Sequence, residues 1–468
     1  MTTPRLLTFA VLTVAVLALV GCEKGKIPST PNLPATESKG DPEPRVTKPP
    51  VVPLPTDKVP VEPPAIPEPE PVPVTPADKT KLETAEKKKA RVEGPQANGG
   101  YRVTIDASAD PAEVLAILKG TKCVIDLTIE GAILTNDTLK WLDGFDYLES
   151  LALIRCDMAT GTGFGALARL PRLKTVSIAG GAKITDAGLR ELAQLPALDT
   201  ISLDSVPISG VAFAAPGWAK LREISATKTS FDDAGLEAVA GLPVLESLDI
   251  HATKVSDAGV KHLERAKSLT YLVLDNTGVG DAGLVALGKL PALKELHLEG
   301  TKVTDTGVSA LGDAGALRVL NLEKTAVTGS AFATFPQPSA LRKLNLNGTK
   351  FTDANGPYLA RFTALTNLSL IACPVTDAGL TSLADLKKLT NLNLSGTKTG
   401  DGTAKLVGAL PQLEIATFDG TALTDAGLKD AAQGVRLKFL YARNTKVTKR
   451  GAVEAAKFAR EGVKVVVE

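Results

Sequence analysis

The chain has 468 residues, and its 53 lysines and arginines against 52 aspartates and glutamates give a formal net charge of +1. This balance excludes a general electrostatic attraction to nucleic acid. Aromatic residues make up only 4% of the chain, which suits many small, similar core layers better than one large irregular core. A chain of this length holds either several ordinary domains or one repetitive array.

The first 22 residues indicate an export signal. Arg5 gives a positively charged start, and an apolar run of 15 residues follows from Leu6 to Val20. Such a run is short for a membrane span, which needs about 20 residues, but it is typical of a secretory signal peptide. The run closes on the tetrapeptide LVGC, whose last residue is Cys22. An ordinary signal peptide, or an uncleaved anchor, with a coincidental cysteine is the alternative.

The LVGC tetrapeptide resembles the lipobox of bacterial lipoproteins. This resemblance implies that residues 1–22 form a lipoprotein signal peptide, cut before the cysteine, and that the Cys22 thiol is lipidated. Several acyl chains hold a protein on a membrane far better than one, since each buried methylene group contributes about 0.8 kcal/mol. We therefore expect an exported protein that stays attached to a membrane of the cell envelope.

Residues 23–98 differ in composition from the rest, because 18 of the 31 prolines lie there. Proline supplies no backbone donor for a helix or sheet interior, and the segment offers few large apolar residues to bury. We predict a disordered, semi-rigid linker. Recognition of this linker by proline-binding modules is an alternative. Within it, the segment from Asp78 to Glu93 is expected to be a solvated helix or coil.

Residues 124–460 repeat a pattern with a period close to 24 residues. The clear copies begin at Leu245, Leu269, Leu293, Leu317, Leu341, Leu365, Leu389 and Leu413. Weaker copies begin at Val124, Leu148, Leu173, Leu198, Leu221 and Leu437, which gives about 14 copies in all. Positions are counted from the first residue of each copy.

Each copy predicts a strand, a turn, a short helix and a return loop. Apolar residues at positions 1, 4 and 6 indicate the strand, and apolar residues at positions 16, 19 and 22 have helical spacing. One unit cannot bury its apolar side alone, whereas a stack of units can. The Leu-x-x-Leu-x-Leu signature resembles the leucine-rich repeat family, specifically its ribonuclease-inhibitor-like and GALA-type repeats. The resemblance implies an α/β solenoid with a curved parallel sheet on the concave side and short helices on the convex side.

Position 9 departs from the family, which usually has asparagine there. Here it is mostly threonine, with cysteine at Cys156 and Cys373. A short polar side chain at this position is expected to bond the backbone where the chain leaves the strand. The two cysteines are therefore expected to be buried turn residues, about 43 Å apart by strand spacing and unable to pair.

An aspartate recurs at position 13, or at position 14 in the longer copy from Leu173, in segments such as VTDTGV at Val303. The equivalent residues are Asp186, Asp233, Asp257, Asp281, Asp305, Asp377 and Asp425. A general acid needs one special environment, whereas a helix start needs a capping oxygen and favours negative charge in every copy. We predict that the preceding Thr, Ser or Asp is the cap and that the glycine two residues later permits close approach of neighbouring copies.

Two copies break the helical pattern, and the ends of the array differ from the rest. In PISGVAFAAPGW and AVTGSAFATFPQP, four aromatic residues are expected to fill the volume left by a shortened helix: Phe213, Trp218, Phe332 and Phe335. A binding spot on the convex side is the alternative there. Residues 99–123, with a strand and a helix after Asp110, are expected to cap the N-terminal end. Residues 461–468 are expected to form a closing strand.

Functional side chains are expected at positions 3, 5 and 7, which point outward from the concave face. An acidic row and an amide row result, with Lys294, Arg318 and Arg342 along one margin. The candidate ligand-binding residues are Asp249, His251, Asp275, His297, Glu299, Asn321, Glu323, Asn345 and Asn347. Such rows suit a protein, a peptide or a sugar chain. A sheet face that is polar only for solubility is the alternative.

An aromatic and basic cluster of Phe439, Tyr441 and Arg443 has residue types enriched at binding hot spots, although packing beneath the C-terminal cap explains it equally well. Catalysis has little support. His251 and His297 lie two strands apart, roughly 10 Å, which is too far for a direct catalytic hydrogen bond. No cysteine or histidine spacing indicates a metal site, and no cofactor is implied.

The sequence thus predicts a non-catalytic, lipid-anchored protein of the cell envelope. We expect it to bind a protein or a surface polymer through the concave face, as a monomer and without nucleic acid. A regulatory adaptor or enzyme inhibitor of the leucine-rich repeat type is the alternative, and a hydrolase using the region of His251 and His297 is the least favoured.

Overall fold

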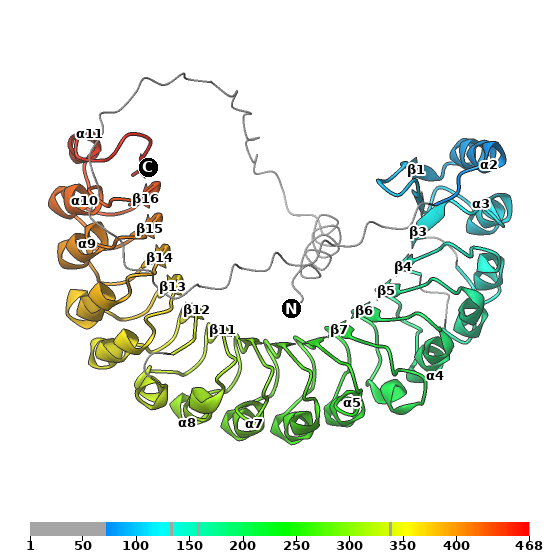
Figure 1. Ribbon diagram of the computed structural model, residues 1–468, viewed down its shortest axis with the longest axis horizontal. Coiled ribbons are helices and arrows are strands. Elements are labelled where there is room, and N and C mark those ends of the chain that lie inside the picture. Colours follow the sequence, from blue (N-terminus) through cyan, green and yellow to red (C-terminus); the bar gives the residue numbers. More distant parts are fainter. Residues whose placement is uncertain (1–71, 132–133, 157–159, 337–338, 468) are drawn as a thin grey trace, which may run out of the picture. The chain divides into compact units, whose positions relative to one another are not determined.

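The computed structural model describes residues 72–131, 134–156, 160–336 and 339–467. The expected signal peptide, the lipidation site at Cys22 and the linker up to residue 71 lie outside these residues. The repeats stack into a curved coil, with strands along its inner side and helices along its outer side (Figure 1). The predicted parallel-sheet solenoid is confirmed.

The described residues contain one sheet of 17 strands. Each strand pairs with its neighbours in sequence; β1 and β2 are antiparallel, and every later pairing is parallel. The first nine are β1 Arg91–Glu93, β2 Tyr101–Ile105, β3 Val124–Glu130, β4 Ser150–Ile154, β5 Thr175–Ala179, β6 Thr200–Asp204, β7 Glu223–Thr227, β8 Ser247–Asp249 and β9 Tyr271–Val273. The others are β10 Glu295–His297, β11 Val319–Asn321, β12 Lys343–Asn345, β13 Asn367–Ser369, β14 Asn391–Asn393, β15 Ile415–Thr417, β16 Phe439–Tyr441 and β17 Lys464–Val466.

The helices are short because the chain must return to the next strand within one period. The α-helices are α2 Pro76–Lys87, α3 Pro111–Leu118, α4 Asp186–Arg190, α5 Asp233–Val239, α6 Asp257–Val260, α7 Asp281–Leu287, α8 Asp305–Ser309, α9 Asp401–Gly408, α10 Asp425–Ala431 and α11 Lys449–Ala456. The 3₁₀ helices are η1 Thr138–Leu142, η2 Phe164–Arg169, η3 Glu191–Gln194, η4 Val211–Ala214, η5 Lys261–Arg265, η6 Ala310–Asp313, η7 Ser330–Thr334, η8 Asp353–Arg361 and η9 Asp377–Asp385. In the described part of the chain, no helix has the length and apolar character needed to cross a membrane.

The apolar residue at position 4 of each copy, which is leucine in ten of the 14 copies, forms part of the core. Leu248, Leu272 and Leu296 pair directly across β8, β9 and β10, and all three are fully buried. Because side chains alternate along a strand, the residues on either side of each leucine face the concave surface.

The turn after each strand has the same backbone conformation in every copy. Position 8 has positive φ in all 14 copies: Gly131, Arg155, Gly180, Ser205, Lys228, Ala252, Asn276, Gly300, Lys324, Gly348, Ala372, Gly396, Gly420 and Asn444. This left-handed conformation is unfavourable for residues with a Cβ atom, yet eight of the copies lack glycine there. The stacking of the repeats therefore imposes the turn, whatever residue occupies it.

The threonine at position 9 bonds the backbone of its own copy, as predicted. The hydroxyl of Thr301 donates to the carbonyl of Leu298 at 2.7 Å, and Thr349 donates in the same way to Leu346 at 2.7 Å. Cys156 and Cys373 are buried, also as predicted. The Cys373 thiol lies 3.0 Å from the carbonyl oxygen of Leu346, which belongs to the preceding copy.

The recurring aspartate has a structural role that extends beyond its own helix. Thr304 caps α8 as predicted, because its hydroxyl accepts from the N–H of Thr306 at 3.2 Å. The aspartate itself reaches the next copy: Asp281 accepts from the N–H of Thr304 at 2.7 Å and from its hydroxyl at 2.6 Å. Nine aspartates make such a contact: Asp186, Asp233, Asp257, Asp281, Asp305, Asp353, Asp377, Asp401 and Asp425. We call this set the aspartate ladder.

The glycine at position 15 packs against the aspartate ladder, which confirms the predicted close approach. A Cβ atom on Gly307 would lie 2.5 Å from Oδ1 of Asp281 and 2.7 Å from its Cα. The same holds for Gly259, whose Cβ would lie 2.5 Å from Oδ1 of Asp233. No side chain fits between neighbouring helices at this position.

The N-terminal cap begins earlier than the sequence suggested. The predicted strand and helix are present as β2 and α3, and Asp110 caps α3 by accepting from the N–H of Ala112 at 2.9 Å. However, residues 76–93 are not simply solvated: α2 contacts α3 and buries Leu82 and Ala85, and β1 pairs with β2. The two apolar side chains on one face of α2 account for the difference, since the lysine-rich composition of the segment conceals them.

The two broken copies contain 3₁₀ helices, η4 and η7, and their aromatic residues fill the core. Phe213, Trp218, Phe332 and Phe335 are at most 3% exposed, as predicted. Trp218 lies 5.2 Å from the ring of Phe213 and donates its indole N–H to the carbonyl of Ala212 at 3.1 Å.

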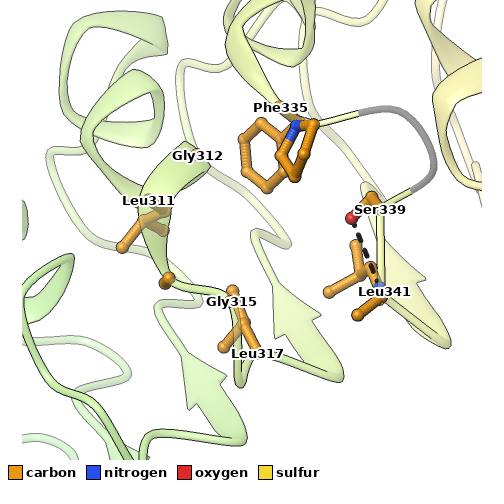
Figure 2. Close-up of a pocket in the computed structure, with 10 residues that line it drawn as sticks. Leu311, Gly312, Gly315, Leu317, Phe335, Ser339 and Leu341 are labelled. Carbon is orange, nitrogen blue, oxygen red and sulfur yellow. Dashed lines mark hydrogen bonds between the residues drawn. The ribbon is translucent and has the colours of Figure 1, made fainter.

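A small pocket of about 150 Å³ lies beside η7, where the chain returns to β12 (Figure 2). Leu311, Leu317, Phe335 and Leu341 line it, together with Ser339. The Ser339 hydroxyl oxygen already accepts from the N–H of Leu341 at 3.3 Å. The lining contains no charged side chain, so it has no group for acid–base chemistry.

Candidate binding face

The inward-facing residues of the sheet form the candidate site. In β8, β10 and β11, and again in β13 to β16, the middle residue is buried and its two neighbours are half-buried on the concave side. We call positions 3, 5 and 7 of the copies that contain β8 to β16 the concave face. In-register pairing places equivalent positions of adjacent copies side by side, at about 4.8 Å per strand.

Acidic side chains gather on one part of the concave face, on β8 to β11 and the residues that follow these strands. They are Asp249, Asp275, Glu295, Glu299 and Glu323, and we call them the acidic half. Lys324 forms ion pairs with Glu299 at 2.7 Å and with Glu323 at 3.3 Å. These contacts raise the pKa of the Lys324 ammonium group.

The two histidines of this region each bond a carboxylate on their own copy. Nδ1 of His251 lies 3.0 Å from Oδ1 of Asp249, and Nε2 of His297 lies 2.8 Å from Oε1 of Glu295. The ring of Tyr271, on the strand between them, lies 5.7 Å from the ring of His297. The structure thus places both predicted histidines on the concave face, in two separate pairs.

The contact with Asp249 raises the pKa of His251, although burial and Lys228 oppose this effect. Because the folded pKa is raised, the contact stabilises the fold fully below the unfolded pKa of about 6.5, and this stabilisation is lost as pH rises through the folded pKa. We expect Asp249→Asn to lower the pKa of His251, measured by NMR titration of the histidine ring signals.

Asparagine keeps the acceptor that Asp249 offers to the N–H of His251 at 3.1 Å, so the substitution removes the charge with little change in backbone geometry. Asn321, Asn345 and Asn393 fill this position in other copies. An unchanged His251 pKa in the Asp249→Asn variant would contradict the role given to this carboxylate.

The negative charge of the acidic half contributes to the raised pKa of Asp275 and of Tyr271. Burial raises the pKa of Asp275, with Glu299 and Asp249 acting in the same direction, while the N–H of Glu299 and the nearby His297 oppose the shift. Burial also raises the pKa of Tyr271, and Asp249, Glu295 and Asp275 add to that shift. The acidic half therefore favours the approach of positive charge.

Most of the predicted binding residues also have a structural role that the sequence did not reveal. The N–H groups at position 7 lie beyond the end of the strand and need an acceptor. Seven of them, on His251, Glu299, Glu323, Asn347, Ile371, Ser395 and Arg443, donate to a nearby side chain. The acceptors are Asp249, Asp275, Asn321, Asn345, Asn347, Asn393 and Asp419. All of these acceptors are aspartate or asparagine, whose side chains are short enough to reach a nearby backbone N–H. This restriction to two residue types was the one sign of the structural role in the sequence.

The predicted amide row meets the acidic half at Glu323. Oε2 of Glu323 lies 3.1 Å from Nδ2 of Asn345 and 3.5 Å from Nδ2 of Asn347. Oδ1 of Asn347 in turn accepts from the Ser369 hydroxyl at 2.6 Å. Asn345 and Asn347 are thus brought together with Glu323, whereas Asp249 and His251 lie three strands away.

The basic margin occupies position 2 of three successive copies. In three other places, oppositely charged residues at this position pair between neighbouring copies, such as Lys174 with Glu149 at 3.0 Å. Arg318 instead donates to the carbonyls of Gly315 and Leu317, at 2.9 and 3.0 Å. Lys294 and Arg342 form no ion pair with any residue that the structure describes. The margin therefore adds positive charge beside β10 to β12.

The aromatic and basic cluster at β16 is held together by the chain itself. The rings of Phe439 and Tyr441 stack at 6.2 Å and 5°. The guanidinium of Arg443 lies 5.5 Å from the ring centre of Tyr441 and bonds Asp419 at 2.8 Å, while the ammonium of Lys464 lies 5.8 Å from the ring centre of Phe439. The C-terminal strand β17 thus supplies one of its contacts.

Within residues 72–467, excluding the undescribed gaps, no group of three histidine, cysteine, aspartate or glutamate side chains is placed to hold a metal ion. The concave face offers carboxylates, amides and imidazoles in fixed positions. Each of its two histidine–carboxylate pairs joins side chains of one copy.

Two adjacent stretches, residues 265–288 and 289–312, match the family model described as the Leucine Rich repeat. No curated protein matches the chain in sequence. An internalin from Listeria monocytogenes is 16% identical, with a TM-score of 0.51 over 77% of this chain and 94% of that one. A leucine-rich repeat protein of Leptospira interrogans is 17% identical, with a TM-score of 0.54 over 75% of this chain and 91% of that one.

A plant peptide hormone receptor, solved in a complex, is 14% identical, with a TM-score of 0.46 over 78% of this chain and 68% of that one. At the identities of the two bacterial proteins, the likeness concerns the fold. With the parallel sheet, the outer helices and the two matching repeats, it leads to one conclusion: the chain folds as a leucine-rich repeat solenoid.

Proposed function

We propose that this chain is a lipid-anchored protein of the cell envelope that binds a protein or a surface polymer through its concave face and performs no catalysis. The observation that carries this proposal is the acidic half, in which five carboxylates on adjacent copies are held by hydrogen bonds and ion pairs before any partner arrives. Such preorganisation reduces the entropy that binding would otherwise lose.

The anchor part of the proposal rests on the LVGC tetrapeptide and on the apolar run before it. Cells fed a radioactive fatty acid are expected to label the wild-type protein in the membrane fraction and to leave a Cys22→Ala variant unlabelled. Soluble, unlabelled wild-type protein would rule out the lipid anchor.

The binding part is tested by charge reversal in the acidic half. The double variant Glu299→Lys/Glu323→Lys is expected to lose the partners that the wild type recovers in a pull-down from envelope extract. The matched control reverses two exposed acids away from the concave face, Asp313→Lys/Glu454→Lys, and is expected to recover them as the wild type does. Identical recovery by all three proteins would show that the acidic half serves solvation only.

A further inference from the structure

The part of the concave face next to the acidic half contains no acidic residue. Positions 2, 3, 5 and 7 of the copies that contain β12, β13 and β14 hold two cations, amides, hydroxyls and one isoleucine. We define the amide strip as Arg342, Lys343, Asn345, Asn367, Asn391 and Asn393. Arg342 and Lys343 are exposed and form no ion pair with any described residue. The sign of the charge therefore changes between β11 and β12.

The amide strip presents hydrogen-bond donors because the oxygen atoms of three of its four asparagines already accept hydrogen bonds within the chain. Oδ1 of Asn345 accepts from the N–H of Asn347 at 3.0 Å, and Oδ1 of Asn393 accepts from the N–H of Ser395 at 3.0 Å and from its hydroxyl at 2.7 Å. Oδ1 of Asn367 accepts from the Thr366 hydroxyl at 2.8 Å. An amide whose oxygen is held has its NH₂ group left to offer.

One carboxylate of the chain itself shows how an acid sits on these donors. The side chain of Glu323 crosses from the previous copy to the Nδ2 atoms of Asn345 and Asn347. One and two strands further on, at Asn367, Asn391 and Asn393, no described residue accepts a hydrogen bond from Nδ2. The same donors thus recur, at about 4.8 Å per strand, without an acceptor from the chain.

We propose that the amide strip binds an acidic segment of a polypeptide that crosses the strands of the sheet. This inference rests on the proposed function and names the chemistry of the partner. Carboxylates of the segment accept from the asparagine NH₂ groups as Glu323 does, and Arg342 and Lys343 add charge complementarity. A ligand that continues onto the acidic half must change its sign of charge. A polypeptide does so from one residue to the next, whereas an acidic polysaccharide carries the same charge in every unit.

The test measures binding of a fluorescein-labelled peptide of alternating glutamate and serine to the full chain, by fluorescence anisotropy. We expect Asn367→Asp/Asn391→Asp to weaken binding at least about tenfold, because two charge-assisted hydrogen bonds become repulsive contacts. The matched control, Thr175→Asp/Ser177→Asp, places two carboxylates on β5 of the same sheet, outside the strip. It is expected to bind as the wild type does, and circular dichroism confirms that both variants are folded.

Equal affinity of the strip variant and the wild type for the acidic peptide, or no binding of this peptide at all, would overturn the proposal. Binding of oligogalacturonate in place of the peptide would also overturn it, since the ligand would then be a polysaccharide. These results remain distinct from failure of the proposed function. A partner that is lost on Glu299→Lys/Glu323→Lys and unaffected by the strip variant would refute the amide strip alone.

Discussion

Gly356→Ala is expected to destabilise the repeats around β12 and β13 by about 3 kcal/mol or more. Gly356 lies in η8, where a Cβ atom would overlap the carbonyl oxygen of Gly379 and come within 2.6 Å of its carbonyl carbon. In the other direction, a Cβ atom on Gly379 would lie 2.6 Å from Cα of Asp353. The helices η8 and η9 thus meet backbone to backbone, and neither side can yield by rotating a side chain.

The measurement is urea-induced unfolding, combined with hydrogen exchange. The amides of η8 and η9 are expected to exchange faster in the variant, because each repeat contacts only its neighbours and the damage stays local. Gly315→Ala is the control, since a Cβ atom on Gly315 meets nothing within 4 Å. That change is expected to stay within about 0.5 kcal/mol of the wild type. Wild-type urea resistance of Gly356→Ala would refute the backbone contact.

Asp305→Ala is expected to cost about 2 kcal/mol and to loosen η7. The carboxylate accepts four hydrogen bonds from the next copy: from the N–H and hydroxyl of Thr328 at 2.8 and 2.7 Å, and from the N–H groups of Gly329 and Ala331 at 3.0 and 3.1 Å. The N-cap residue of η7 is Gly329, which has no side chain to accept them. The one other side-chain contact to the start of this helix among the described residues is long: the Thr328 hydroxyl accepts from the N–H of Ser330 at 3.5 Å.

The effect of Asp305→Ala depends on pH in a defined direction. Burial alone would raise the pKa of Asp305, but the hydrogen bonds from Thr328, Ala331 and Gly329 outweigh it and lower the pKa below 3.8. The stabilisation is therefore complete above the unfolded pKa and is lost as pH falls through the folded one. The difference between wild type and variant should shrink in acid. Asp313→Ala, an exposed acid of the preceding helix, is the control; an equal loss of stability there would contradict the prediction.

Much of the fold could be predicted because the same pattern of residues recurs in every copy. The leucine at position 4 and the threonine at position 9 fixed the strand and the turn, and the structure confirms both. The cap formed by Thr304 was equally predictable, since capping is a local interaction. The contact from Asp281 to the next copy was not predicted, because it joins groups 23 residues apart and depends on how closely the copies stack.

The candidate site was less predictable than the fold. The sequence placed Asp249, Asn321 and Asn345 on the concave face, which is where they lie. It could not show that an oxygen of each is occupied by a backbone N–H, because this depends on where the strand hydrogen bonds stop. That the amide strip offers mainly donors follows only once this internal use of oxygen atoms is known. The lipid anchor at Cys22 remains a prediction.

The aspartate ladder gives the stack a direction. Each aspartate of the ladder accepts from the start of the helix in the next copy. If the C-terminal copy unfolds, the aspartate of the copy before it is merely exposed to water. If the N-terminal copy unfolds, the N–H groups at the start of the following helix instead lose the carboxylate that accepts from them. Unfolding from the C-terminal end should therefore be easier than unfolding from the N-terminal end. During synthesis, which proceeds from the N-terminus, the aspartate that caps each new helix is already in place when that helix forms.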